Sequence, residues 1–130
     1  MIFIAAQYIY LGNGILKKNQ ILKFDSKGQL LEFADFKEEI HSTVFCNGIL
    51  LPIVSKNEDI PSIFEKMKEI TKRNREIALT ELLDSFNLIY QLKSGETCDL
   101  WCLENPDFNN MRIQENTTIN KVSITPSSEL

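Results

Sequence analysis

The sequence changes character at Asn47-Gly48-Ile49-Leu50-Leu51-Pro52. Within it, the Asn-Gly pair is a turn signal, and the three aliphatic residues are typical of a short buried strand that Pro52 ends. Residues 1–54 as a whole are rich in β-branched and aromatic side chains, which favour strands. Residues 59–94 have apolar side chains at helical spacing. The stretch therefore marks the boundary between a β-rich segment and a helical segment.

The β-rich segment contains the signals of several short strands. Residues 2–11 are predicted to form the first strand, which Gly12-Asn13-Gly14 ends. Asp25-Ser26-Lys27-Gly28 is typical of a hairpin turn, because its glycine suits a left-handed backbone. The elements predicted around this turn are strands at 20–24, 29–33 and 43–46 and one helical turn at 36–40.

Two helices are predicted within residues 59–94. The first begins at Asp59, shortly before a proline in the first helical turn. Its apolar face consists of Ile63, Phe64, Met67 and Ile70. The second begins with Thr80 as N-cap and is stopped by Gly95. Its apolar face consists of Leu82, Leu83, Phe86, Ile89 and Tyr90.

The chain returns to strands after the helices. Residues 99–103 and 117–124 are predicted strands, separated by a turn at Asn105-Pro106-Asp107. Neither β-rich segment, 1–54 or 97–125, is large enough for a core of its own. We therefore predict a single domain over residues 1–130, mainly β or α+β. In it, a β-sandwich built from both segments carries an inserted two-helix hairpin.

Length and composition exclude several classes of protein. The chain has 130 residues, 43% hydrophobic and 25% charged, which suits one globular domain. A TIM barrel needs roughly 200 residues or more. The net charge of −4 argues against binding to nucleic acid or to an anionic membrane. The first six residues carry no basic side chain, so neither a signal peptide nor a membrane span is predicted.

The three cysteines, Cys46, Cys98 and Cys102, do not follow the spacing of a disulfide framework. Their odd number predicts reduced thiols in a cytoplasmic protein. Cys98 and Cys102 are four residues apart, which places both on one face of a strand. Buried apolar thiols are therefore predicted in this strand.

Residues 8–16 (YIYLGNGIL) and 24–32 (FDSKGQLLE) precede the stretch at 47–52, and residues 79–84 and 92–113 follow it. The first two resemble the opening hairpins of amidohydrolases of the cytosine deaminase and chlorohydrolase type. The stretch at 47–52 is similar to the strand that leads into the barrel of that family, and the later passages resemble its last helix and closing strands. The resemblance implies the family's small composite β-sandwich without its catalytic barrel.

In working members of the family, two histidines one residue apart at the end of that strand bind the catalytic metal. Here those positions hold Asn57 and Asp59 in one register, or Glu58 and Ile60 in another. The single histidine, His41, precedes the strand. No catalytic residue, cofactor or standard metal site is therefore predicted. Weak candidates for an oxygen-ligand site are Asn57, Glu58 and Asp59, for which the simpler role is a polar loop and helix N-terminus.

Three functions fit these observations. The first is a non-catalytic, barrel-less relative of amidohydrolases that acts as a structural or interaction module and forms a homodimer, or binds another protein, through the face that the barrel would cover. The second is a module that binds a small ligand in a groove left where the barrel would sit, which a pocket lined by polar groups from residues 52–60 would favour. The third is a metal-dependent hydrolase of C–N bonds with a non-standard or shared site.

Overall fold

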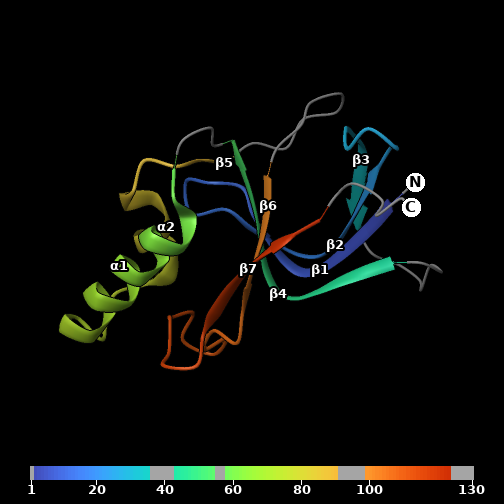
Figure 1. The fold of residues 1–130 in the computed structure, drawn as a ribbon. Coiled ribbons are helices and arrows are strands. Elements are labelled where there is room, and N and C mark those ends of the chain that lie inside the picture. The colour runs from blue at the N-terminus through green and yellow to red at the C-terminus, as the bar shows by residue number, and fades with distance from the viewer. Residues whose placement is uncertain (1, 36–42, 55–57, 91–98, 124–130) are drawn as a thin grey trace.

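The computed structural model of the chain describes residues 2–35, 43–54, 58–90 and 99–123, and Figure 1 shows their arrangement. They form the strands and helices β1 (Ile2–Tyr10), β2 (Leu16–Phe24), β3 (Leu30–Asp35), β4 (Thr43–Val54), α1 (Ile60–Arg73), α2 (Leu79–Ser85), β5 (Ile89–Tyr90), β6 (Asp99–Glu104) and β7 (Thr118–Val122). The predicted class, mainly β or α+β, is confirmed.

The described strands belong to one mixed sheet with the order β3-β2-β1-β4-β6-β7, and β5 pairs with the end of β4. β1 and β4 are parallel, whereas the other neighbouring strands are antiparallel. The C-terminal strands β6 and β7 join the N-terminal strands through the β4–β6 pairing. The two β-rich segments therefore complete one sheet, which is continuous and bends on itself.

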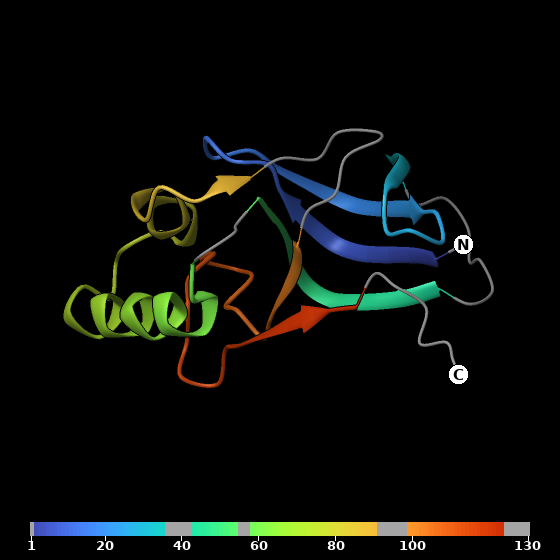
Figure 2. The same cartoon turned by 45° about the horizontal axis from the view of Figure 1, so that its top comes forward.

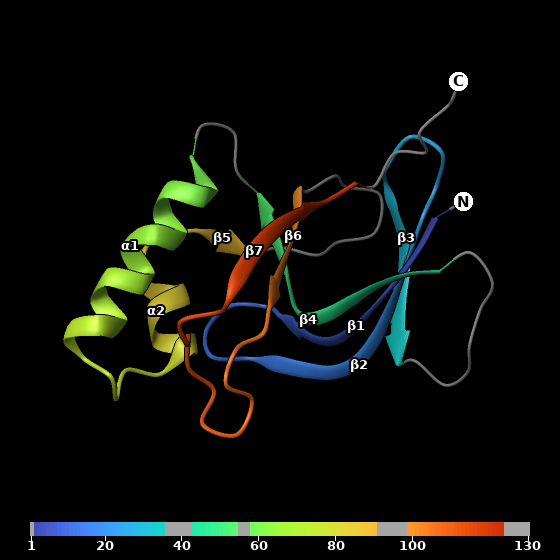
Figure 3. The ribbon, with the colours of Figure 1, turned by 60° about the horizontal axis from the view of Figure 1, so that its bottom comes forward.

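The bend of the sheet lies at Asn47-Gly48, where the sequence predicts a turn. That prediction is wrong, because β4 runs without a break from Thr43 to Val54. The pairing with β1 shifts at this point: Ala6 pairs with Cys46, and Tyr8 pairs with Ile49. β4 thus has one more residue than β1 here, and such a bulge bends a strand. Figure 3 shows β4 changing direction as it passes from β1 to β6.

The prediction that Pro52 ends the strand is also wrong. Pro52 pairs with Leu100 of β6. On its other side, the partners of β4 pass from β1 at Leu50 to β5 at Ile53. Proline lacks an amide hydrogen, and the gap between these two partners is where a strand tolerates that loss.

The sheet has two apolar faces, each with its own core. On the inner face, Ile4, Leu22, Leu50 and Leu100 belong to one buried cluster. On the outer face, Ile49, Leu51 and Leu103 share a second cluster with Phe64, Met67, Leu82 and Leu83 of the two helices. The helices therefore cover the outer face, but only at the end of the sheet where β4, β5 and β6 meet (Figure 2).

The first helix agrees with its prediction, whereas the second is shorter than predicted. Asp59 is the N-cap of α1, as expected. The N-cap of α2 is Ala78, not Thr80, and makes no side-chain capping bond. Asn87 adopts a left-handed backbone with φ of 56°, so the helix cannot continue. Ile89–Tyr90, predicted as helix, instead forms β5. The stop predicted at Gly95, like the helical turn predicted at 36–40, lies outside the described residues.

A buried tyrosine joins β1 to α2 and to the turn after β1. The Tyr10 hydroxyl donates to Oδ1 of Asp84 at 2.6 Å and accepts from the Gly14 N–H at 2.9 Å. Its ring meets the Tyr90 ring edge to face, with centroids 4.9 Å apart. The Tyr90 hydroxyl in turn donates to the Leu83 carbonyl at 2.8 Å. These bonds link the short α2 to the strands although α2 lacks a side-chain cap.

High pH is expected to destabilise the protein through Tyr10. Burial and the hydrogen bond to Asp84 raise the pKa of Tyr10 from 10.0 to about 12. The unfolded chain therefore releases this proton first, so the free energy of unfolding falls as the pH rises from about 10 towards 12. Urea unfolding at about pH 8 and about pH 11 measures the fall. The Tyr10→Phe variant should show a smaller fall, and an equal fall would exclude Tyr10 as its main source.

Candidate functional site

Of the predicted metal candidates Asn57, Glu58 and Asp59, the structure describes only Glu58 and Asp59. Asn57, like the lone histidine His41, lies outside the described residues. Asp59 uses its carboxylate to cap α1: Oδ1 accepts from the Ser62 N–H at 3.2 Å, and Oδ2 accepts from the Ser62 hydroxyl at 2.9 Å. Glu58 precedes this cap. In the described part of the chain, no three His, Cys, Asp or Glu side chains group as metal ligands would.

A small apolar gap lies beside the described residues of the segment 52–60, of which 55–57 lie outside the described residues. Ile53 and Ile60 line it, together with Phe64 and Met67 of α1 and Leu103 of β6. Its volume is about 10 Å³, which is room for one water molecule at most. Its lining has no polar surface. The gap is therefore a packing imperfection between α1 and the outer face of the sheet.

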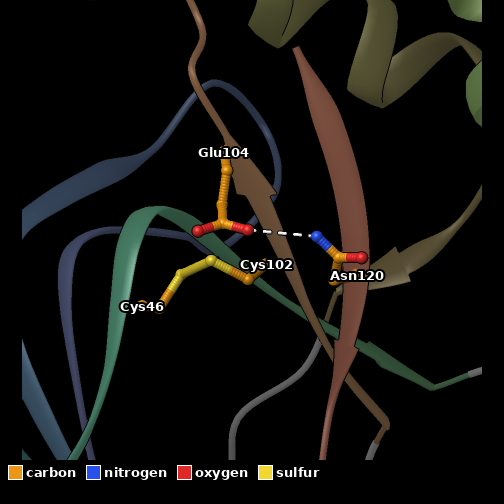
Figure 4. Close-up of a disulfide and its surroundings, with 4 residues drawn as sticks. All are labelled: Cys46, Cys102, Glu104 and Asn120. Carbon is orange, nitrogen blue, oxygen red and sulfur yellow. Dashed lines mark hydrogen bonds between the residues drawn. A yellow bond between two sulfur atoms is a disulfide. The ribbon is translucent and has the colours of Figure 1, made fainter.

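Two of the cysteines form a disulfide, so the prediction of reduced thiols is wrong for them. Cys46 in β4 and Cys102 in β6 are joined, with their Cα atoms 5.9 Å apart. Both side chains point to the inner face, and the bend in β4 brings them together (Figure 4). Beside them, the Asn120 amide donates to the Glu104 carboxylate at 3.0 Å. Cys98 lies outside the described residues.

The disulfide bears on the predicted location of the protein. Disulfides persist in oxidising compartments and are rare in the cytosol. The cytoplasmic location stays a prediction, but its premise fails for Cys46 and Cys102. Neither α1 nor α2, the two helices of the described residues, has the length and apolarity to cross a membrane.

The outer face carries a second group of apolar residues that the helices do not cover. Phe45 of β4, Ala5 of β1, Ile21 of β2 and Ala34 of β3 lie side by side in register across four strands. Residues in register share a face of the sheet. We call these four residues the outer row. The Phe45 side chain is 58% exposed and Ala34 is also exposed, whereas Ile21 is partly buried and Ala5 is buried.

A neighbouring aromatic residue extends the outer row. Phe3, two residues before Ala5 in β1, is on the same face and is only partly buried. The ammonium group of Lys23 lies 5.9 Å from the centre of the Phe3 ring. This cation–π contact covers part of the Phe3 ring, whereas Phe45 on the adjacent strand β4 is 58% exposed.

The strand that carries Phe45 also has an open edge. β6 pairs with β4 only from Gly48 to Ile53. Within the described residues, Thr43–Asn47 thus has a partner on one side, which is β1. Val44 and Phe45, adjacent in this segment, are 46% and 58% exposed. An edge with free backbone groups and exposed apolar side chains is a template for a further strand. We call residues 43–47 the open edge.

The sequence predicts a strand at 43–46 but not its exposure. Three consecutive apolar residues, Val44, Phe45 and Cys46, are typical of a strand buried on both faces. In the structure only Cys46 of these three is buried, in the inner-face cluster, whereas Val44 on the same face and Phe45 on the outer face are exposed. The sequence hints at this surface only through the apolar run Val44 to Cys46, which gives the strand two apolar faces, and the Asn-Gly bulge signal that follows it.

The chain matches no protein-family model, no curated protein and no solved structure. The resemblance to amidohydrolases therefore stays a prediction.

Proposed function

We propose that this chain is a non-catalytic interaction module, derived from the composite domain of an amidohydrolase, that binds a protein through the outer row and the open edge. The observation that carries the proposal is the exposure of Phe45, which is 58% exposed at the point where the outer row meets the open edge. Folded monomers seldom leave a large aromatic side chain exposed beside further apolar surface unless something binds there.

The charges along the sheet edges support this choice of surface. β3, at one end of the sheet, carries Glu32 and Asp35, and β7, at the other, carries Lys121. Charges of this kind are a common protection against unwanted strand pairing. The open edge has no charged residue in Thr43–Asn47. Because no charge prevents strand pairing there, the open edge can pair with a strand of a binding partner.

The division of the outer face supports the relation to amidohydrolases. The sheet is made from both ends of the chain, which is the composition that the resemblance predicts. The two helices cover one half of the outer face, and the outer row occupies the other half. We propose that the outer row belongs to the surface that a barrel would cover in a working relative.

Photocrosslinking tests the proposal in cells that produce the protein. A benzophenone amino acid in place of Phe45 should give discrete crosslinked products, because a bound protein would cover this position. The same amino acid in place of Glu65, on the exposed side of α1, is the matched control and should give none. Absence of products at position 45, or the same products at both positions, would refute the interaction surface.

A further inference from the structure

The inference that follows rests on the proposed function and names the partner. We propose that the occupant of the open edge is a second copy of this chain. The two copies pair through Thr43–Asn47, antiparallel and related by a two-fold axis, so that one sheet runs through the dimer.

The chemistry of the partner follows first from the backbone. The open edge presents peptide N–H and C=O groups that no described strand satisfies on the side away from β1. An extended strand satisfies such a row of groups, whereas a helix cannot, because its own backbone groups are already paired. The occupant is therefore a β-strand.

The side chains restrict the partner further. All of β4, from Thr43 to Val54, is free of charged residues. A charged strand placed opposite it would lose water around its charges and gain no counter-charge. The occupant is therefore an uncharged strand with apolar side chains. The sequence of the open edge itself, Thr-Val-Phe-Cys-Asn, meets this requirement.

Two-fold symmetry makes the edge complementary to itself. An interface of this kind uses the same patch on both subunits, and antiparallel strands satisfy that condition. With the axis at Phe45, its ring lies opposite Phe45 of the partner subunit, on the outer face of both sheets. Aromatic pairs at directly opposite positions stabilise antiparallel strands. The two Phe45 rings then cover each other on the outer face of the joined sheet.

The rest of the fold leaves room for this pairing. The helices lie at the other end of the outer face, over Ile49 and Leu51. The disulfide at Cys46 lies on the inner face, so it does not block the approach of a strand in the plane of the sheet. The paired segment is short, however, and covers less surface than the roughly 1,600 Å² of a standard stable interface. We therefore expect a weak dimer with a dissociation constant on the order of 10–100 µM.

Sedimentation equilibrium of the full chain from about 5 to about 500 µM tests the inference. The wild type should pass from monomer to dimer over this range. Phe45→Lys places like charges opposite each other and should be monomeric throughout. Phe45→Thr keeps a good strand former and removes the ring, so it should weaken the dimer by up to about fivefold. Ile89→Lys is the control: Ile89 is also 58% exposed but lies in β5, and its replacement should leave the dimer unchanged.

Circular dichroism of each variant separates loss of the dimer from loss of the fold. If Phe45→Lys does not fold, the comparison between Phe45→Thr and Ile89→Lys still shows whether the dimer depends on Phe45. A wild type that stays monomeric at about 500 µM, or a dimer that neither Phe45 variant weakens, would overturn the second copy as partner. Crosslinks from position 45 to a different protein would then leave the proposed function intact, whereas the absence of any crosslink would remove that function itself.

Discussion

Gly48→Ala is expected to cost about 3 kcal/mol of stability, or to prevent folding. A Cβ atom on Gly48 would collide with the carbonyl oxygen of Leu103, and it would lie 3.0 Å from the Leu103 carbonyl carbon and 3.2 Å from Cα of Glu104. All three are backbone atoms of β6, so no side chain can move aside to relieve the collision. β4 and β6 would have to separate, and their pairing is what joins the two β-rich segments.

Urea unfolding of the variant and the wild type measures this loss. Gly14→Ala is the matched control, because nothing lies within 4 Å of the Cβ it would add. Its cost comes only from the left-handed backbone, with φ of 76°, and should be about 1 kcal/mol. If Gly48→Ala cost no more than Gly14→Ala, the close approach of β4 and β6 would not exist in solution.

Removal of the Cys46–Cys102 disulfide is expected to cost up to about 4 kcal/mol. The two residues are 56 positions apart, so the bond restricts a long loop in the unfolded chain. The chain-entropy estimate for such a loop is close to this value, although strain in the folded state lowers it in practice. The double variant Cys46→Ala/Cys102→Ala should therefore unfold at a clearly lower urea concentration.

The same loss should follow from a thiol reductant. Dithiothreitol should destabilise the wild type and leave the stability of the double variant unchanged. The double variant is therefore the control for effects of the reductant that do not involve this bond. In the absence of reductant, alkylation of the denatured wild type should label one cysteine of the three, since two are in the disulfide. Labelling of all three, or equal stability with and without dithiothreitol, would contradict the bond.

Local features of the fold could be predicted because they depend on neighbouring residues. The Gly28 turn closes as expected: Gly28 has a φ of 82°, and its N–H donates to the Asp25 carbonyl at 3.1 Å. The cap at Asp59 depends only on Ser62, three residues away. Short-range hydrogen bonds of this kind need no knowledge of the rest of the chain.

Features that depend on distant strands could not be predicted. Asn47-Gly48 reads as a turn until β6 supplies partners that carry the strand through it. Ile89 and Tyr90 have the spacing of a helical face, but in the structure they pair with β4 as a strand. In both cases, tertiary pairing overrides the local preference.

The surface proposed to bind a partner could not be predicted from the sequence either. The exposure of Phe45 depends on how far β6 extends along β4, and this follows from the bend at Gly48. The disulfide depends on the same bend, which brings Cys46 to Cys102. Sequence spacing instead associated Cys102 with Cys98, because alternation along one strand is all that the sequence shows.

The disulfide has a further consequence for the helical segment. α1, α2 and β5 all lie between Cys46 and Cys102, so the bond closes them into a covalent ring. Arg73, the last residue of α1, and Arg75, in the connection between the helices, are exposed and therefore open to trypsin-like proteases. A chain cut there would stay one molecule, because the disulfide joins the N-terminal piece, which carries Cys46, to the C-terminal piece, which carries Cys102.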